Sequence, residues 1–178
     1  MSNKVLLDSL KINVLLNRLT CQLLEFHGDF SETVLIGLQP RGVFLLDRIV
    51  FLLKDKYGVH DLKVGKLDTT FYRDDFRRSE KIHSARPTEL NFEVEGKKIV
   101  LIDDVLYTGR SIRSALTAID YFGRPSIIEL LVLIDRRFSR HLPIQPDYLG
   151  VQIDALEGDK VRVEWKSKMR KDCVYIEK

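Results

Sequence analysis

Apolar residues recur at helical spacing in three stretches of the chain, residues 9–26, 43–58 and 109–123. Spacings of three and four residues place these side chains along one face of a helix. The first stretch ends just before Gly28 and the second ends at Gly58, and glycine is common where helices end. The pattern therefore predicts three amphipathic helices, each of which can bury one face.

Three other stretches are short, continuously apolar and rich in β-branched residues: 33–38, 97–104 and 126–135. Runs of this kind are typical of strands that are buried on both faces of a parallel sheet. Residues 62–72 and the alternating segment 160–166 are further strand candidates. Because the strands alternate with the helices, the pattern predicts an α/β fold with a central parallel sheet and right-handed crossovers.

Two segments break this alternation. Residues 73–91 are dense in charge and have almost no periodic apolar residues, so we expect a long, mobile loop, for which an active-site lid is the common functional case. Residues 136–150, RRFSRHLPIQPDYLG, are interrupted by prolines and are expected to form a second loop.

The composition is that of an ordinary globular protein. Among the 178 residues, 44% are hydrophobic and 31% are charged, which argues against disorder and predicts a single domain over residues 1–178. The formal charge of +3 permits contact with phosphates but does not indicate a dedicated nucleic-acid binder. Cys21 and Cys173 lack metal-ligand spacing, and we expect both to be reduced. No apolar stretch approaches the ~20 residues of a membrane helix and no signal peptide is evident, so we expect a cytoplasmic protein.

An acidic pair, Asp103 and Asp104, lies at the end of the apolar run 97–104. Ligands of open α/β sheets bind outside the carboxyl ends of the strands, so the pair is in the position of a binding site. The turn from Val105 to Gly109 then leads into a helix, and the free N–H groups of such a turn form an anion site. If a ribose phosphate bound its phosphate there, the two carboxylates would lie beside the vicinal hydroxyls of the ribose. The alternative is that the acids only cap the turn.

Other nucleotide-binding motifs do not occur, because the sequence contains neither GxxxxGK[ST] nor GxGxxG. A metal-binding phosphoacceptor site, as in response-regulator receivers, is another interpretation of the acidic pair. It leaves the following segment VLYTG unexplained.

The segment IVLIDDVLYTGRS, residues 99–111, resembles the phosphoribosyl-pyrophosphate (PRPP) motif of type I phosphoribosyltransferases, with four apolar residues, two acids and a small loop containing Thr-Gly. The variant DDVLYTGR is similar to that of the PyrR family of pyrimidine-operon attenuators, which are also uracil phosphoribosyltransferases. Further segments match that family: PRG at 40–42, YRDD at 72–75, GRP at 123–125, and DR followed by LPIQPDYLG within 135–150. The resemblance spans most of the chain and is loose at its two ends.

This resemblance implies the type I phosphoribosyltransferase fold, in which a central parallel sheet is flanked by helices and carries a small hood and a flexible active-site loop. It implies a transferase that converts uracil and PRPP to UMP and pyrophosphate with Mg²⁺, which is bound through the substrate rather than by a dedicated protein site. It also implies regulation of pyrimidine biosynthesis genes through UMP-dependent binding to attenuator hairpins in mRNA, and a homodimer or larger homo-oligomer. Two alternatives are transfer to a purine, hypoxanthine or guanine, and a non-catalytic nucleotide-sensing regulator that binds RNA.

The resemblance also implies roles for individual residues. Asp103 and Asp104 would bind the 2′- and 3′-hydroxyls of the ribose, and the residues after them would bind the 5′-phosphate. This PRPP and nucleotide site comprises Val105, Leu106, Tyr107, Thr108, Gly109, Arg110 and Ser111, together with Gln39, Pro40, Arg41 and Gly42 of a pyrophosphate loop. Lysine is frequent at the position of Gln39 in relatives, so we expect some loss of affinity for pyrophosphate.

The base would be bound near Ile134, Asp135 and Arg136, partly through backbone groups. Arg73, or its neighbours Arg77 and Arg78, would neutralise pyrophosphate when the active-site loop closes. A solvated run of charge is the other interpretation of these loop arginines.

Binding to RNA requires a basic surface that contacts phosphates. In the first predicted helix, Cys21 stands where relatives commonly have a histidine, so the resemblance is looser in this helix. The candidate residues are Lys11, Arg18, Arg137 and Arg140, with a further basic cluster of Lys160, Arg162, Lys166, Lys168, Arg170 and Lys171. Ordinary surface charge is the alternative for each of them.

Overall fold

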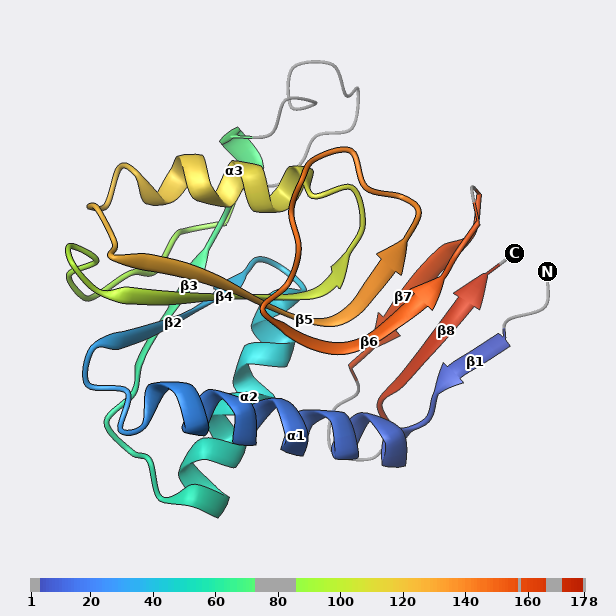
Figure 1. The fold of residues 1–178 in the computed structure, drawn as a ribbon, viewed down its shortest axis with the longest axis horizontal. Helices are drawn as coiled ribbons and strands as arrows, with labels where there is room; N and C mark the ends of the chain where they lie inside the picture. The colour runs from blue at the N-terminus through green and yellow to red at the C-terminus, as the bar shows by residue number, and fades with distance from the viewer. Residues whose placement is uncertain (1–3, 73–85, 157, 166–170, 178) are drawn as a thin grey trace.

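A computed structural model describes residues 4–72, 86–156, 158–165 and 171–177. Its centre is a parallel sheet of five strands in the order β3-β2-β4-β5-β6 (Figure 1). These strands are β2 (Thr33–Leu38), β3 (Lys63–Leu67), β4 (Lys98–Leu106), β5 (Ile127–Arg137) and β6 (Tyr148–Asp154). From β2 the chain moves to one edge of the sheet and from β4 it moves to the other, so the strand order reverses between β2 and β4. Ligands of open α/β sheets bind at such a reversal.

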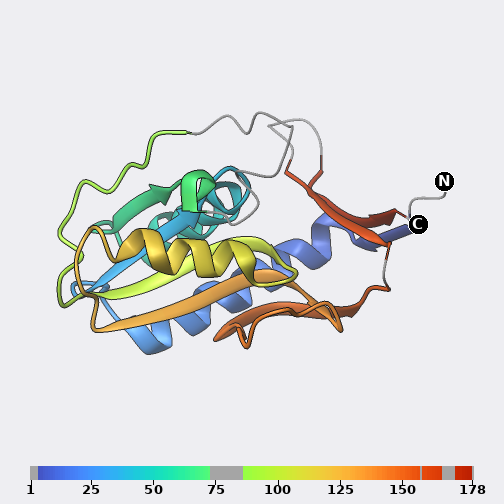
Figure 2. The same ribbon diagram turned by 90° about the horizontal axis from the view of Figure 1, so that it is seen from above.

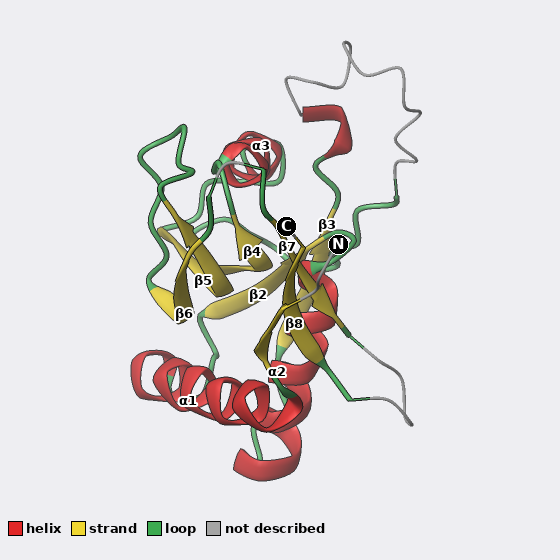
Figure 3. Ribbon diagram, turned by 90° about the vertical axis from the view of Figure 1, so that its right-hand side faces the viewer, coloured by secondary structure: helices red, strands yellow, loops and turns green. Residues whose placement is uncertain are grey.

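Helices cover both faces of the central sheet (Figures 1 and 3). α1 (Ser9–His27) and α2 (Gly42–Tyr57) lie on one face, and α3 (Arg110–Ile119) lies on the other. In β4, Val100 packs into the core shared with α1 and α2, whereas the next residue, Leu101, packs into the core shared with α3. Burial on both faces explains why the strands are continuously apolar.

A second, smaller sheet lies beyond the carboxyl ends of the central strands (Figures 1 and 2). It consists of β1 (Lys4–Leu7), β8 (Cys173–Glu177) and β7 (Lys160–Glu164) in antiparallel order. We call this sheet the hood. Its residues Val163 and Val174 are buried in the same core as α1 and α2.

The expected fold class is confirmed, but the strands differ from the prediction in several places. The expected loop 136–150 is shorter than predicted, because β5 continues to Arg137 and β6 begins at Tyr148. The preceding prolines and Gly150 conceal the start of β6, and no strand is predicted for the rest of it. Gly150 is required by close packing, since a Cβ there would lie 2.3 Å from the carbonyl oxygen of Leu133 in β5. β4 continues past its expected end, so the acidic pair lies within the strand. β1 and β8 are too short to show a periodic pattern.

The segment after β3 also differs from the prediction. β3 ends at Leu67, and a single 3₁₀ turn, η1 (Thr70–Tyr72), follows it where a longer strand is expected. Residues 73–85 of the expected loop lie outside the described residues, and Glu89 pairs with Lys66 at the edge of β3. Among the described helices, none has the length and apolar character needed to cross a membrane.

Candidate functional site

The acidic pair lies at the carboxyl end of β4, beside the point where the strand order reverses. Asp103 and Asp104 are consecutive strand residues, yet both line one cavity of about 300 Å³. Asp104 is buried, and its Oδ2 accepts a hydrogen bond from Arg41 Nε at 2.8 Å. The Oδ1 of Asp103 accepts the backbone N–H of Asp104 at 2.9 Å. The two carboxylates thus share one cavity and differ in their partners.

Burial raises the pKa of both carboxyl groups above the usual value for aspartate. The charge of Asp104 raises the pKa of Asp103 further, whereas the Arg41 guanidinium lowers the pKa of Asp104. A ligand that donates hydrogen bonds to both carboxylates would stabilise their charged forms. The pair is therefore suited to a ligand with two adjacent hydroxyl groups.

The residues after the acidic pair form a loop at the N-terminus of α3. Gly109 precedes this helix with a φ of +88°, a backbone conformation that favours glycine. The loop surrounds a second cavity of about 280 Å³, which is lined by Asp103 and residues 105–112. Because the N–H groups at a helix N-terminus attract anions, this cavity is suited to a phosphate group.

The loop after β2 meets the acidic pair from the neighbouring strand. Its Gln39–Pro40 peptide bond is cis. A Cβ at Gly42 would lie 2.2 Å from the carbonyl oxygen of Ile102 and 3.0 Å from the Cα of Asp103. Only glycine allows the loop to approach β4 this closely. The loop expected to bind pyrophosphate therefore lies against the acidic pair.

Gln39 joins this loop to the end of β3. Its backbone N–H donates to the carbonyl oxygen of Leu67 at 2.9 Å, and its Nε2 donates to the carbonyl oxygen of Pro87 at 2.7 Å. The side chain of Gln39 thus holds a neighbouring segment of the chain.

The carboxyl end of β5 forms a third side of the site. Ile134, Asp135 and Arg136 are all buried. Asp135 forms an ion pair with Arg140 and accepts a hydrogen bond from Gln152 Nε2 at 3.2 Å. The Asp135 carboxylate is therefore already bound by two side chains.

Tyr107 connects the loop of residues 105–111, here called the phosphate loop, to the end of β5. The Cζ of Arg136 lies 4.0 Å from the centre of the Tyr107 ring, and its Nε and Nη2 are buried without a hydrogen-bond partner among the described residues. The carbonyl oxygen of Tyr107 accepts a hydrogen bond from Arg140, and that of Thr108 accepts one from the His141 N–H at 3.0 Å. The segment after β5 therefore holds the phosphate loop in place.

The structure brings most of the predicted site residues together. The cavity beside the acidic pair is lined by Gln39, Pro40, Arg41, Asp103, Asp104, Val105, Tyr107, Ser111 and Arg136. Thr69 and Val161 also line it, although the sequence pattern did not single them out. A threonine after one strand and a valine within another carry no distinguishing sequence signal, and only the folded chain places them here. Next to this cavity is a cleft of about 410 Å³, whose lining includes Asp135, Phe138 and Gln152.

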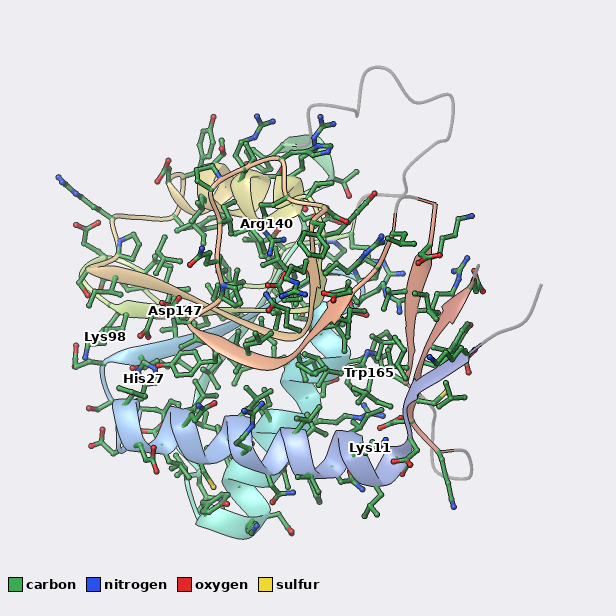
Figure 4. The ribbon with its side chains drawn as sticks, turned by 45° about the vertical axis from the view of Figure 1, so that its right-hand side comes forward. Lys11, His27, Lys98, Arg140, Asp147 and Trp165 are labelled. Atoms are coloured by element: carbon green, nitrogen blue, oxygen red, sulfur yellow. The ribbon has the colours of Figure 1, made fainter. Side chains whose placement is uncertain are left out.

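The candidate RNA-binding residues do not form a single patch. Figure 4 shows Lys11 on α1 and Arg140 beyond the opposite face of the central sheet. Arg18 donates hydrogen bonds to the carbonyl oxygens of Leu149 and Gly150, and Arg137 forms a two-pronged ion pair with Asp154 at 2.7 Å.

Several predicted residues cannot be placed. Arg73 and the adjacent loop arginines lie outside the described residues, as do Lys166, Lys168 and Arg170 of the basic cluster. Their roles remain predictions.

Comparison with known proteins agrees with this geometry. Residues 2–168 match the model of the phosphoribosyl transferase domain. The chain is 43% identical to the Bifunctional protein PyrR of Gloeothece citriformis, with 92% of each protein covered, and 40% identical to that of Picosynechococcus sp., with 90% of this chain and 89% of the relative covered. It is 36% identical to the Bifunctional protein pyrR of Enterococcus faecalis, with 100% of this chain and 98% of the relative covered.

Solved structures show the same fold at lower identity. A hypoxanthine phosphoribosyltransferase from Staphylococcus aureus matches with a TM-score of 0.63 and 20% identity, covering 85% of this chain and 78% of that one. A hypoxanthine-guanine phosphoribosyltransferase from Bacillus anthracis matches with a TM-score of 0.64 and 15% identity, covering 86% and 85% of the two chains. The type I phosphoribosyltransferase fold is therefore shown.

Proposed function

Because the chain belongs to the PyrR family of phosphoribosyl transferase domain proteins, we propose that it transfers the phosphoribosyl group of PRPP to uracil, with release of pyrophosphate. The observation that carries this proposal is the meeting of three elements at the reversal of strand order. The acidic pair, the phosphate loop and the loop after β2 line adjoining cavities, and each suits a different part of PRPP.

In this proposal the protein acts mainly by binding and orienting PRPP. Asp103 and Asp104 accept hydrogen bonds from the 2′- and 3′-hydroxyls, and the loop of residues 105–111 holds the 5′-phosphate. The backbone of residues 39–42 holds the pyrophosphate. As the bond from C1 to pyrophosphate breaks, positive charge grows on the ribose, and the two carboxylates that bind its hydroxyls favour that charge. No nucleophilic side chain is needed, since the base itself attacks a correctly oriented C1.

In this proposal Mg²⁺ enters the site bound to PRPP. Among the described residues there is no group of three or more His, Cys, Asp or Glu side chains that could hold a metal ion. Asp104 is already bound by Arg41, and oxygens of PRPP and water would supply the ligands that Mg²⁺ prefers. The ion would neutralise the charge of the departing pyrophosphate.

Uracil is the proposed base because PyrR family members are uracil phosphoribosyltransferases. It would lie at the carboxyl end of β5, near Ile134, Asp135 and Arg136. Hypoxanthine or guanine is the alternative, since the solved structures with this fold include phosphoribosyltransferases for those bases.

The test is pyrophosphate release from PRPP and Mg²⁺ with uracil, hypoxanthine, guanine and adenine supplied separately. We expect turnover with uracil alone. Turnover with a purine alone would replace the base assignment, and no turnover with any base would favour a regulator that only senses nucleotides.

Regulation through RNA is the second part of the proposal. The relatives are named bifunctional, and in this chain RNA binding would use Lys11, Arg18, Arg137 and Arg140 in a homodimer or larger assembly. Binding that depends on phosphate contacts weakens steeply as salt is added. We expect a pyrimidine-operon hairpin to bind more tightly with UMP than without it, and more tightly at about 50 mM than at about 200 mM salt. Equal binding of an unrelated hairpin would contradict this part of the proposal.

A further inference from the structure

We propose that Arg41 is a positioning residue that couples the hood to the acidic pair, rather than a ligand of pyrophosphate. This inference rests on the proposed transfer reaction, because it assigns a role within the same site. It also departs from the expectation drawn from the family resemblance, in which Arg41 is one of the residues that bind pyrophosphate.

The Arg41 side chain joins three elements. Its Nε donates to Asp104 Oδ2 at 2.8 Å, and its Nη2 donates to the carbonyl oxygen of Val163 in β7. Arg41 itself lies in the loop before α2. Because one planar guanidinium makes both hydrogen bonds, it fixes the position of β7 relative to the end of β4.

The position of β7 matters because this strand contributes to the cavity. Val161 lines the cavity beside Asp103 and Asp104, and it lies two residues before Val163 in β7. Alternate residues of a strand share a face, so a shift of β7 at Val163 would also move Val161 over the acids. Arg41 therefore holds one wall of the cavity at a set distance from the ribose-binding carboxylates.

The same hydrogen bond tunes the charge of the acidic pair. Asp104 faces the like charge of Asp103 on β4 and the opposite charge of Arg41 from the loop before α2, and Arg136 of β5 lines the same cavity. Without Arg41, the buried Asp104 would lose its bound cation and would take up a proton at a higher pH. A protonated Asp104 carries an O–H donor on one oxygen and no negative charge, so it would bind a ribose hydroxyl more weakly.

The hood has a second arginine link that makes a matched control. Arg48 of α2 donates two hydrogen bonds to Asp172, at 2.7 and 2.8 Å, and its guanidinium lies 4.6 Å from the centre of the Trp165 ring. Neither Arg48 nor these two partners lines the acid cavity. Arg48→Ala should therefore loosen the hood and leave the titration of the acids unchanged.

The test compares Arg41→Ala, Arg41→Lys and Arg48→Ala with the wild type. Carbon-13 NMR of the Asp103 and Asp104 carboxyl groups and amide hydrogen exchange over residues 160–164 are measured on the protein without substrate. The pH dependence of kcat/KM for PRPP is then measured where turnover occurs. For Arg41→Ala we expect the acid titration to move up by about one pH unit or more, and exchange in β7 to be about tenfold faster.

Arg41→Lys should restore the acid titration but not the slow exchange, because an ammonium keeps the charge and lacks the planar fork. A weaker affinity for pyrophosphate, with the acid titration and the exchange both unchanged, would overturn the proposal. A change in only one of these two readouts in Arg41→Ala would also overturn it. Since both are measured without substrate, they test the role of Arg41 even if the wild type transfers no base.

Discussion

At the residue scale, the acidic pair that suits ligand binding lowers the stability of the folded protein. Burial and the charge of Asp104 raise the pKa of Asp103 above 3.8, so the folded protein keeps a proton that the unfolded chain releases. Stability therefore falls as the pH rises from 3.8 through the pKa of the folded state, and the full cost is present above it. Once both acids are ionised, their burial and mutual repulsion lower the stability of the fold.

Asp103→Asn tests this cost. The amide oxygen can still accept the Asp104 N–H, and the substitution removes the like charge. At about pH 8 we expect stabilisation by about 1 kcal/mol, or a rise of about 2–4 °C in the thermal midpoint, with a smaller rise at about pH 4. Thermal unfolding at the two pH values measures it. A lower midpoint at the higher pH would show that the acid is needed for folding.

Tyr107 gives a second prediction at this scale. Its ring lies against the buried guanidinium of Arg136, so removing the ring leaves that cation without its aromatic neighbour. We expect Tyr107→Leu to lower the free energy of unfolding by about 1 kcal/mol and Tyr107→Phe to retain it. Urea unfolding of both variants provides the comparison. Equal losses in the two variants would mean that the hydroxyl, and not the ring, matters.

At the scale of elements, the site depends on how closely the loop after β2 approaches β4. The methyl group of Gly42→Ala would collide with the carbonyl oxygen of Ile102, so the loop would have to move away from Asp103. We expect a loss of about 1–3 kcal/mol in stability and a fall of at least about tenfold in kcat/KM for PRPP.

Gly58→Ala is the matched control for this prediction. Gly58 ends α2 with a φ of +69°, and a Cβ there would meet nothing within 4 Å. Its substitution should cost stability through backbone strain and leave kcat/KM unchanged. If both variants lost activity in proportion to their stability, the loop position would not be the cause.

The elements also show which parts of the fold can be predicted from the sequence and which cannot. Continuous apolar runs identify β2, β4 and β5, because these strands are covered on both faces. The pattern does not predict β6. Gly150 is needed for close packing against β5, but in the sequence a glycine here indicates a loop. β1 and β8 pair with each other from opposite ends of the chain, and no local pattern encodes that contact.

At the scale of the whole molecule, the site is a consequence of topology. Asp103, Asp104 and the phosphate loop are adjacent in sequence, so their association can be predicted from a motif. The loop after β2 reaches them because the strand order reverses between β2 and β4. The contact of Arg41 with Val163, and the presence of Val161 in the cavity, require the hood to be placed over the sheet. These features follow from the folded chain alone.

The central claim is that the acidic pair binds the ribose of PRPP during transfer to uracil. The most direct measurement is UMP formation from uracil, PRPP and Mg²⁺ by the wild type and by the Asp103→Asn/Asp104→Asn variant, with thermal unfolding as the check on folding. Each charge-assisted hydrogen bond lost should cost about 1.5–3 kcal/mol, so we predict uracil turnover in the wild type and a fall of at least about 100-fold in a variant that still unfolds cooperatively. Undiminished turnover in the double variant would contradict the claim.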